Sequence, residues 1–286
     1  MSLQPVVLPG RLNRAGRRAR DWAPAAAVLV AGIVAWQGLV TAFDIQRFLL
    51  PKPTEIAAAL RENWTFLRHA ALYTFGEAVA GFLVGSAIAI ATALLLARWR
   101  PLGRALLPYA IAANEIPIIA FAPIFNNWFS LVSPIPKIAI AAVLVFFPVM
   151  INMLRGLTSV HPSSIELMRS YAAGEAATFR RVRIPNSLPF LFSGLKVASV
   201  LAMIGAVVSQ YFGGLRTTSL GLFIKEKAAL ALFPEAWAAI VLASVLGVAF
   251  YLAIVLVERS VLRWHPSVRG ARAGCGCWFL VKCVLK

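Results

Sequence analysis

Six polar side chains interrupt stretches of the sequence that are otherwise long and apolar. They are two glutamates and four amides: Glu77, Asn114, Glu115, Asn126, Asn127 and Gln210. Because burying such groups in lipid is costly, they indicate a path for a polar solute, a proton relay or a polar contact between helices. We predict a substrate path, with Glu115 foremost because Pro117 follows it within an apolar span. For Gln210, Asn126 and Asn127, an ordinary contact between helices is a better explanation than a substrate path. For Glu77, a position among the lipid headgroups is as good an explanation as a substrate path.

Motifs for catalysis are missing from the sequence. No Gly-x-x-x-x-Gly-Lys-Ser/Thr stretch occurs, so the chain does not hold ATP phosphates with a P-loop. Neither a nucleophile–base set nor a metal-ligand spacing is present. Cys275, Cys277 and Cys283 lie near the C-terminus without a histidine or aspartate cluster, which argues against a metal site there. We therefore predict that the chain is not an enzyme and holds no metal or cofactor.

The composition is that of a protein embedded in a lipid bilayer. Of 286 residues, 60% are hydrophobic and 14% charged, with a mean hydropathy of +0.79. A soluble domain would carry about a quarter charged residues. A formal net charge of +17 could indicate nucleic-acid binding, but the basic residues lie at the ends of apolar stretches, as membrane topology requires. We predict an all-α integral membrane protein with no nucleic-acid partner.

Six stretches are long enough to cross the membrane, since about 20 apolar residues suffice. They cover about residues 22–43, 71–97, 105–129, 137–154, 188–208 and 236–257. Gly81 and Gly85 have the spacing of a close helix contact. No internal repeat is visible. The pattern predicts one six-span domain over residues 22–259, after a basic arm (1–21) and before a tail (260–286).

The segment 161–185 cannot cross the membrane, because arginine at membrane depth costs about 3 kcal/mol. It contains Arg169, Arg180, Arg181 and Arg183. Ser163 and Glu166 have the spacing of a capping box, which predicts a surface helix. Gly174 is expected to end that helix, and Pro185 to end a second one that begins at Glu175. An amphipathic loop lying on lipid headgroups would show the same pattern.

This segment resembles the cytoplasmic loop signature of bacterial binding-protein-dependent ABC importer permeases. The signature has Glu, two small residues, three more, Gly, nine more, Ile, any residue and Leu-Pro. Glu166 takes the Glu place, Ala172 the Gly place and Val182 the Ile place, and Ile184-Pro185 stands for Leu-Pro. Leu167-Met168 in place of two alanines and Ala172 in place of Gly are departures. The resemblance implies that these residues couple the chain to an ATPase: Glu166, Leu167, Met168, Ala172, Val182, Ile184 and Pro185.

The resemblance extends over most of the chain. Residues 50–55, 116–129 and 186–198 are similar to the nitrate/sulfonate/taurine branch, whose wider members import pyrimidine vitamin precursors and riboflavin-like compounds. It implies a permease that forms half of a substrate path, expected as two copies of this chain. It also implies two ATP-binding subunits, which would carry the ATP and Mg, and a periplasmic solute-binding protein.

An ion-coupled secondary transporter with Glu77 and Glu115 as relays is the alternative. It would leave the segment 161–185 unexplained, and the inverted repeats of many such carriers are not visible. A structural membrane scaffold would predict neither the polar residues nor this segment.

Basic residues predict the orientation. The N-terminal arm, the turn at 98–104, the segment 155–183 and the tail hold most of them, which indicates cytoplasmic termini in a bacterial inner membrane. The substrate is less well specified. Two acids in the spans, with Lys196 as the one opposing cation, disfavour a bare anion. This slightly favours a pyrimidine or riboflavin-like substrate over nitrate, sulfonate or taurine.

Overall fold

The computed structural model describes residues 14–99, 105, 108–109, 112, 118–129, 133–213 and 218–262, and these residues form helices and no strands. The helices are α1 (Arg14–Ala42), α2 (Pro53–Glu62), α3 (Trp64–Arg98), α5 (Ala122–Phe129), α6 (Ile135–Thr158), α7 (Pro162–Ser170), α8 (Glu175–Thr178), α9 (Ile184–Gly213), α10 (Leu220–Ala229) and α11 (Phe233–Val261). A 3₁₀ turn, η2 (Ile118–Phe121), precedes α5, and a π-helical turn, η3 (Phe179–Arg183), joins α8 to α9.

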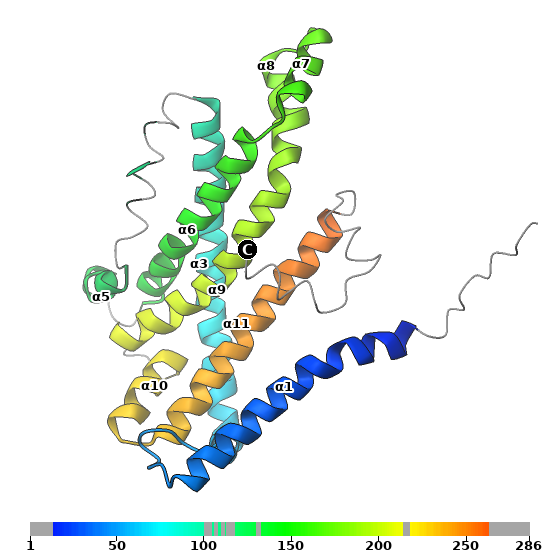
Figure 1. Cartoon of the computed structure of the whole chain (residues 1–286). Helices are drawn as coiled ribbons and strands as arrows, with labels where there is room; N and C mark the ends of the chain where they lie inside the picture. Colours follow the sequence, from blue (N-terminus) through cyan, green and yellow to red (C-terminus); the bar gives the residue numbers. More distant parts are fainter. Residues whose placement is uncertain are drawn as a thin grey trace, which may run out of the picture.

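Helices α3, α6 and α9 form the core of the bundle, with α6 packed along both of the others (Figure 1). Small residues allow this close approach. A Cβ on Gly81 would come within 2.5 Å of the Ala141 Cβ, and one on Gly85 would overlap the backbone of Ala142. The predicted close helix contact at Gly81 and Gly85 is therefore confirmed, with α6 as the partner.

Four helices are long and apolar enough to cross a membrane by length and composition: Trp64–Arg98, Ile135–Thr158, Glu175–Gly213 and Phe233–Val261. They correspond to the second, fourth, fifth and sixth predicted spans. In the first predicted span, the apolar helix Ala26–Ala42 is shorter. In the third, residues 118–129 form η2 and the eight-residue α5, residues 105, 108–109 and 112 are also helical, and the others lie outside the described part of the chain. A helix of eight residues is too short to cross a bilayer.

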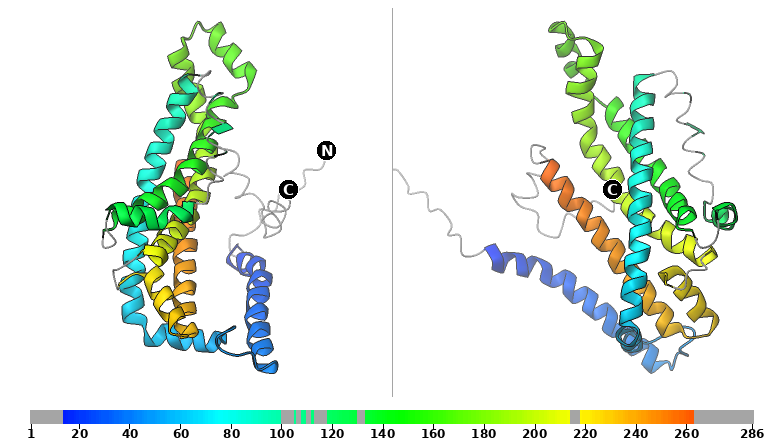
Figure 2. Two further views of the ribbon diagram at one scale, coloured as in Figure 1. Left: turned by 90° about the vertical axis from the view of Figure 1, so that its left-hand side faces the viewer. Right: turned by 180° about the vertical axis from the view of Figure 1, so that it is seen from behind.

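The first helix leaves the bundle (Figures 1 and 2). It contacts α2, and Trp36 meets Trp237 of α11 edge-on with ring centroids 5.7 Å apart. Val28, Leu29 and Val34 are largely exposed along its length. An apolar surface of this kind requires lipid or another protein to cover it.

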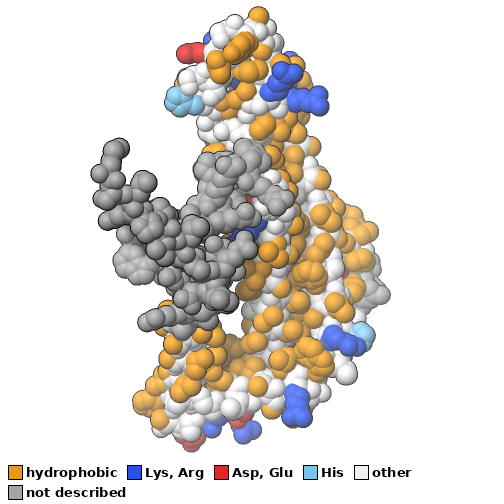
Figure 3. All heavy atoms as spheres, turned by 90° about the vertical axis from the view of Figure 1, so that its right-hand side faces the viewer, with side chains coloured by type: hydrophobic (Ala, Val, Ile, Leu, Met, Phe, Trp, Pro, Cys, Tyr) orange, Lys and Arg blue, Asp and Glu red, His pale blue; other side chains and the backbone are white. Residues whose placement is uncertain are grey.

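The two ends of the bundle carry different elements. Helices α7 and α8 stand beyond the C-terminal end of α3, whereas α10 lies at the opposite end (Figure 1). Hydrophobic side chains cover much of the face seen in Figure 3, and most of its charged side chains gather near the two ends. This distribution fits a protein with a bilayer around its middle.

Candidate functional site

Helix α7 begins earlier than the capping box predicted. Its N-cap is His161, and Pro162 occupies the first turn, where a fixed φ and a missing N–H are tolerated. The His161 Nδ1 lies 2.7 Å from the Ser163 Oγ. Ser163 therefore lies inside the helix, and Glu166 is an exposed residue of the helix body. The predicted capping box is wrong because the proline moves the helix start two residues back.

A left-handed turn at Ala172, which has a φ of 54°, follows the end of α7. The Ala173 N–H donates to the Met168 carbonyl at 3.0 Å and the Ala172 N–H to the Arg169 carbonyl at 2.9 Å. These two bonds form a Schellman motif, whose left-handed residue is usually glycine. The predicted end of this helix at Gly174 is thus wrong, whereas the predicted start of the next helix at Glu175 is confirmed: Gly174, with a φ of −63°, is the N-cap of α8. The left-handed turn falls at the position where the importer signature has glycine.

Pro185 does not end a helix. It lies in the first turn of α9, and the chain runs helically from Glu175 to Gly213. Proline cannot donate a backbone hydrogen bond, so the hydrogen-bond pattern of a helix must adjust where a proline enters it. A π-helical turn is one such adjustment. The π-helical turn η3 lies directly before α9. From Glu175 onward, the surface segment is therefore continuous with a membrane-crossing helix, and the turn at Ala172 joins α7 to it.

The two sides of α7 face different surroundings. Leu167 is 57% exposed and Tyr171 77% exposed, and the two lie four residues apart on one side. Ile165 and Arg169 lie on the other side and line a pocket against the end of α3. No residue of α7 is fully buried. An apolar patch at the tip of the molecule is a surface suited to another protein.

The other residues of the signature lie closer to the bundle. Ala172 is exposed like Glu166 and Leu167, whereas Met168, Val182, Ile184 and Pro185 are half-buried. Just after them, the Asn186 amide donates a 2.8 Å hydrogen bond to the Gly156 carbonyl. A Cβ on Gly156 would lie 2.6 Å from the Ser187 Cα. The start of α9 is therefore fixed tightly against the end of α6.

A buried polar network lies at the opposite end of α9. The Gln210 Nε2 donates to the Glu77 Oε2 at 2.6 Å, and the Gln210 Oε1 accepts from the Thr74 Oγ1 at 3.0 Å. The backbone N–H of Gly221 donates to the same Gln210 oxygen at 3.0 Å, and that of Leu220 donates to the Thr74 Oγ1 at 3.1 Å. The network joins α3, α9 and the first turn of α10. These bonds satisfy N–H groups that a helix start leaves open.

Glu77 also has a positive neighbour. Lys137 on α6 is 4% exposed and interacts electrostatically with Glu77, which is itself 4% exposed. The Lys137 Nζ donates to the Ser133 carbonyl at 3.0 Å. The statement that Lys196 is the one opposing cation is therefore wrong, because the fold brings Lys137 against a carboxylate sixty residues away in the sequence. Glu77 gives no argument against an anionic substrate.

Asn126 lies beside the same end of α9. Its side chain is buried, donates to the Ala122 carbonyl at 2.7 Å, and packs where a Cβ on Gly213 would stand. Its Oδ1 is buried without a hydrogen-bond partner among the described residues. Asn127 is exposed on α5. Asn114 and Glu115 lie outside the described residues, so the role of these residues in a substrate path stays a prediction.

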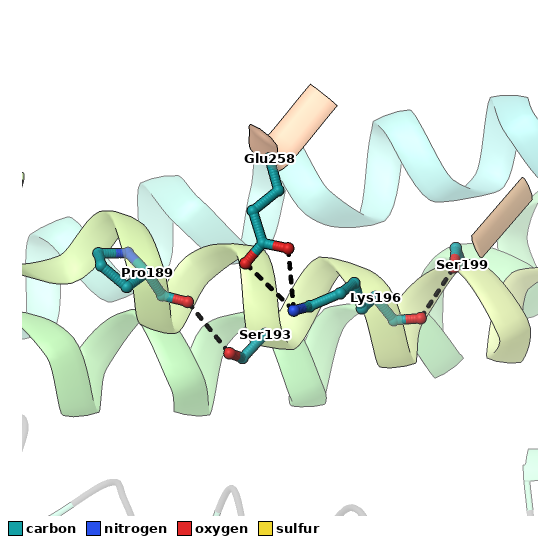
Figure 4. A network of polar contacts seen from close by, with 5 residues as sticks. All are labelled: Pro189, Ser193, Lys196, Ser199 and Glu258. Atoms are coloured by element: carbon teal, nitrogen blue, oxygen red, sulfur yellow. Dashed lines mark hydrogen bonds and ion pairs between the residues drawn. The ribbon is translucent and has the colours of Figure 1, made fainter. Parts of the chain in front are cut away.

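An ion pair between α9 and α11 was not predicted. The Lys196 Nζ lies 3.1 Å from the Glu258 Oε1 and 3.0 Å from its Oε2 (Figure 4). Both side chains are mostly buried, at 24% and 17% exposure. Lys196 lies within the fifth predicted span, whereas Glu258 directly follows the last one, 236–257. A cation within one apolar span and an acid at the end of another can indicate such an ion pair from the sequence alone.

Comparison with known proteins agrees with the resemblance. Residues 64–263 match the family described as binding-protein-dependent transport system inner membrane component. The formylaminopyrimidine transport permease protein ThiX of Halalkalibacterium halodurans is 32% identical over 227 residues, which cover 78% of this chain and 88% of the relative. The riboflavin transport system permease protein RibX of Chloroflexus aurantiacus is 30% identical, with 82% and 87% covered. The putative aliphatic sulfonates transport permease protein SsuC of Bacillus subtilis is 24% identical, with 90% and 93% covered.

The family match covers the core helices α3, α6, α9 and α11 together with the segment 161–185. The relatives are permease proteins of transport systems. The chain belongs to the family of binding-protein-dependent transport system inner membrane components and is a permease subunit of an ABC importer.

Proposed function

We propose that α7 is the element on which an ATP-binding subunit docks, and that the chain imports a small heteroaromatic solute. The observation that carries the first part is the exposed apolar side of α7, with Leu167 and Tyr171, which the turn at Ala172 joins to the helix that continues into α9. A partner that binds α7 can pass a movement on to α9 through the turn at Ala172 and the helix that runs from Glu175 without a break at Pro185. ATP and Mg would be held by that partner.

The proposed movement of α9 would act on contacts at the C-terminal end of this helix. Helix α9 has 30 residues and so spans about 45 Å. Its last turns carry Gln210, which is bonded to α3 and α10, and Gly213, against which Asn126 packs. A displacement of α9 would therefore act on the contacts of Glu77, Gln210 and Asn126. We propose that the substrate path runs beside these residues, with Asn114, Glu115 and Asn127 along the same route.

The proposed assembly needs a second permease copy, because one chain is expected to form only half of a substrate path. Two copies of this chain, two ATP-binding subunits and a periplasmic solute-binding protein would complete the importer. We propose six spans, counting α1 and the stretch 105–129, with both termini and α7 on the cytoplasmic side of a bacterial inner membrane. The excess of basic residues near α7 supports this orientation.

The proposed substrate is a pyrimidine vitamin precursor or a riboflavin-like compound. The support is that the relatives whose names give such substrates are 32% and 30% identical, against 24% for the sulfonate permease. The charge of Glu77 does not disfavour an anion, because Lys137 balances it. Sequence identity to these relatives is therefore the main support for the proposed substrate.

Uptake into proteoliposomes tests the function. The chain, its ATP-binding subunit and its binding protein are reconstituted, and accumulation of labelled formylaminopyrimidine, riboflavin and taurine is followed with and without ATP inside. We expect ATP-dependent uptake of one of the first two. Taurine uptake alone would contradict the proposed substrate, and uptake driven by a proton gradient without ATP would favour the secondary transporter.

Cysteine labelling tests the orientation. Single cysteines at Ser163 and Lys225, both exposed, are introduced after the three native cysteines have been replaced by serine. We expect an impermeant maleimide added outside whole spheroplasts to label Lys225→Cys and not Ser163→Cys. Labelling of both from outside would contradict the proposed topology.

A further inference from the structure

A pocket of about 320 Å³ lies between the C-terminal end of α3 and the turn that joins α7 to α8. Three arginines from three different elements line it: Arg98 on α3, Arg169 on α7 and Arg183 on η3. Glu175 is the one carboxylate among the described residues of the lining. Ile165 and Phe179 add an apolar wall. The cationic surface is therefore assembled by the fold rather than by one run of sequence.

The single carboxylate does not neutralise the pocket. Its Oε2 lies 3.7 Å from the Arg98 Nη1, and the two side chains are 92% and 66% exposed. Such exposed pairs contribute little. Arg98 and Arg169 beside this one exposed carboxylate leave an excess of positive charge. The planar donor fork of arginine matches the oxygens of a phosphate group.

The position of the pocket also fits the surface of a membrane. Arg98 is in the last turn of α3, which is long and apolar enough to span. Trp99 follows it and is 54% exposed, and tryptophan is typical of the boundary between lipid and water. Basic pockets at the cytoplasmic ends of membrane helices bind anionic headgroups. We propose that this pocket binds the phosphate of an anionic phospholipid headgroup, with the apolar wall against the glycerol region.

A bound headgroup would brace α7 from behind. Ile165 and Arg169 turn toward the pocket, whereas Leu167 and Tyr171 lie on the opposite side of the helix. The lipid would therefore connect α3 to α7 and leave the exposed apolar side free. The cytoplasmic placement of the pocket and its effect on ATPase coupling rest on the proposed function, but lipid binding to the purified chain is measured without either, so the two can fail separately.

Native mass spectrometry of the full-length chain in uncharged detergent tests the binding. Phosphatidylglycerol, phosphatidylcholine and inorganic phosphate are titrated separately, and phosphate is also added as a competitor. We expect phosphatidylglycerol adducts, few phosphatidylcholine adducts, and no competition by phosphate. Arg98→Gln and Arg169→Gln should each weaken phosphatidylglycerol binding about fivefold, as expected for one arginine near an anionic surface. Arg180→Gln is the matched control, because Arg180 is exposed on η3 and does not line the pocket.

Three results would overturn the proposal. The first is unchanged phosphatidylglycerol binding in both pocket variants, and the second is an equal loss in Arg180→Gln. The third is displacement of the lipid by phosphate alone, which would make the ligand a free anion. Arg98→Lys guards against misfolding: it keeps the positive charge, and we expect it to bind more tightly than Arg98→Gln at an unchanged melting temperature.

Discussion

The side-chain amide of Gln210 donates a 2.6 Å hydrogen bond to the carboxylate of Glu77 and so joins α9 to α3 at the end of the bundle opposite α7. The same side chain accepts hydrogen bonds from Thr74 and from the backbone of Gly221. One residue therefore connects three helices. Helix α9 has this network at one end and the exposed segment 161–185 near the other, which is the arrangement that a transmitted movement requires.

Gln210→Ala should destabilise the chain strongly. It would remove one hydrogen bond each from the Glu77 carboxylate, the Thr74 hydroxyl and the Gly221 N–H, and a buried group that loses its hydrogen bond costs about 1–3 kcal/mol. We expect a clear drop in melting temperature in detergent, measured by scanning fluorimetry. Asn127→Ala, at an exposed amide, should melt like the unchanged chain. Equal melting of both variants would show that the network contributes no stability.

Gly85→Val should disrupt the contact between α3 and α6. A Cβ at Gly85 would overlap the Ala142 backbone, and overpacking of this kind costs about 1–3 kcal/mol or more. Gly76→Val is the matched control on the same helix, because a Cβ there meets nothing within 4 Å. We expect size-exclusion profiles to show aggregation for the first variant and a single peak for the control. A single peak for both would contradict the close packing.

Ala172→Gly should stabilise the end of α7. The φ of 54° is unfavourable for alanine by about 1 kcal/mol and free of this penalty for glycine. Hydrogen exchange over residues 162–173 should slow in the variant. Ala173→Gly, at the next position, where φ is not positive, should not slow exchange. Faster exchange in Ala172→Gly would mean that the turn is not left-handed in solution.

Lys196 and Glu258 should be energetically coupled. Both are mostly buried, so removing one partner leaves the other charge uncompensated. In a double-mutant cycle of Lys196→Met and Glu258→Gln, we expect the double variant to be more stable than the sum of the single losses by about 1–2 kcal/mol. Melting temperatures of the four proteins supply the measurement. Strict additivity would show that the pair does not interact.

Local patterns predicted much of this fold correctly. Apolar length identified the helices that contain Ala78, Val145, Ala202 and Ala239, and the spacing of Gly81 and Gly85 identified a close contact. Each of these features is determined by a short stretch of sequence. The chemistry of burial in lipid also selected Glu77 and Gln210 before their contact was known.

The predictions from sequence that the structure contradicts failed for physical reasons. At the start of α7, Pro162 outweighs the Ser163 capping signal because proline fits the first turn of a helix. At Pro185, the π-helical turn η3 precedes a proline that would otherwise end the helix. The pairings of Glu77 with Lys137 and of Lys196 with Glu258 depend on which helices become neighbours, and periodicity does not specify that.

Co-purification with the ATP-binding subunit tests the central claim most directly. The tagged full-length chain is co-expressed with that subunit, and the ratio of the two proteins is measured after affinity purification. We predict that Leu167→Asp and Ala172→Arg lose the subunit, because both place a charge on or beside the exposed side of α7. Lys225→Asp, an equally exposed charge change on α10, should retain it. Full retention of the subunit by both α7 variants would contradict the assignment of α7 as the docking element.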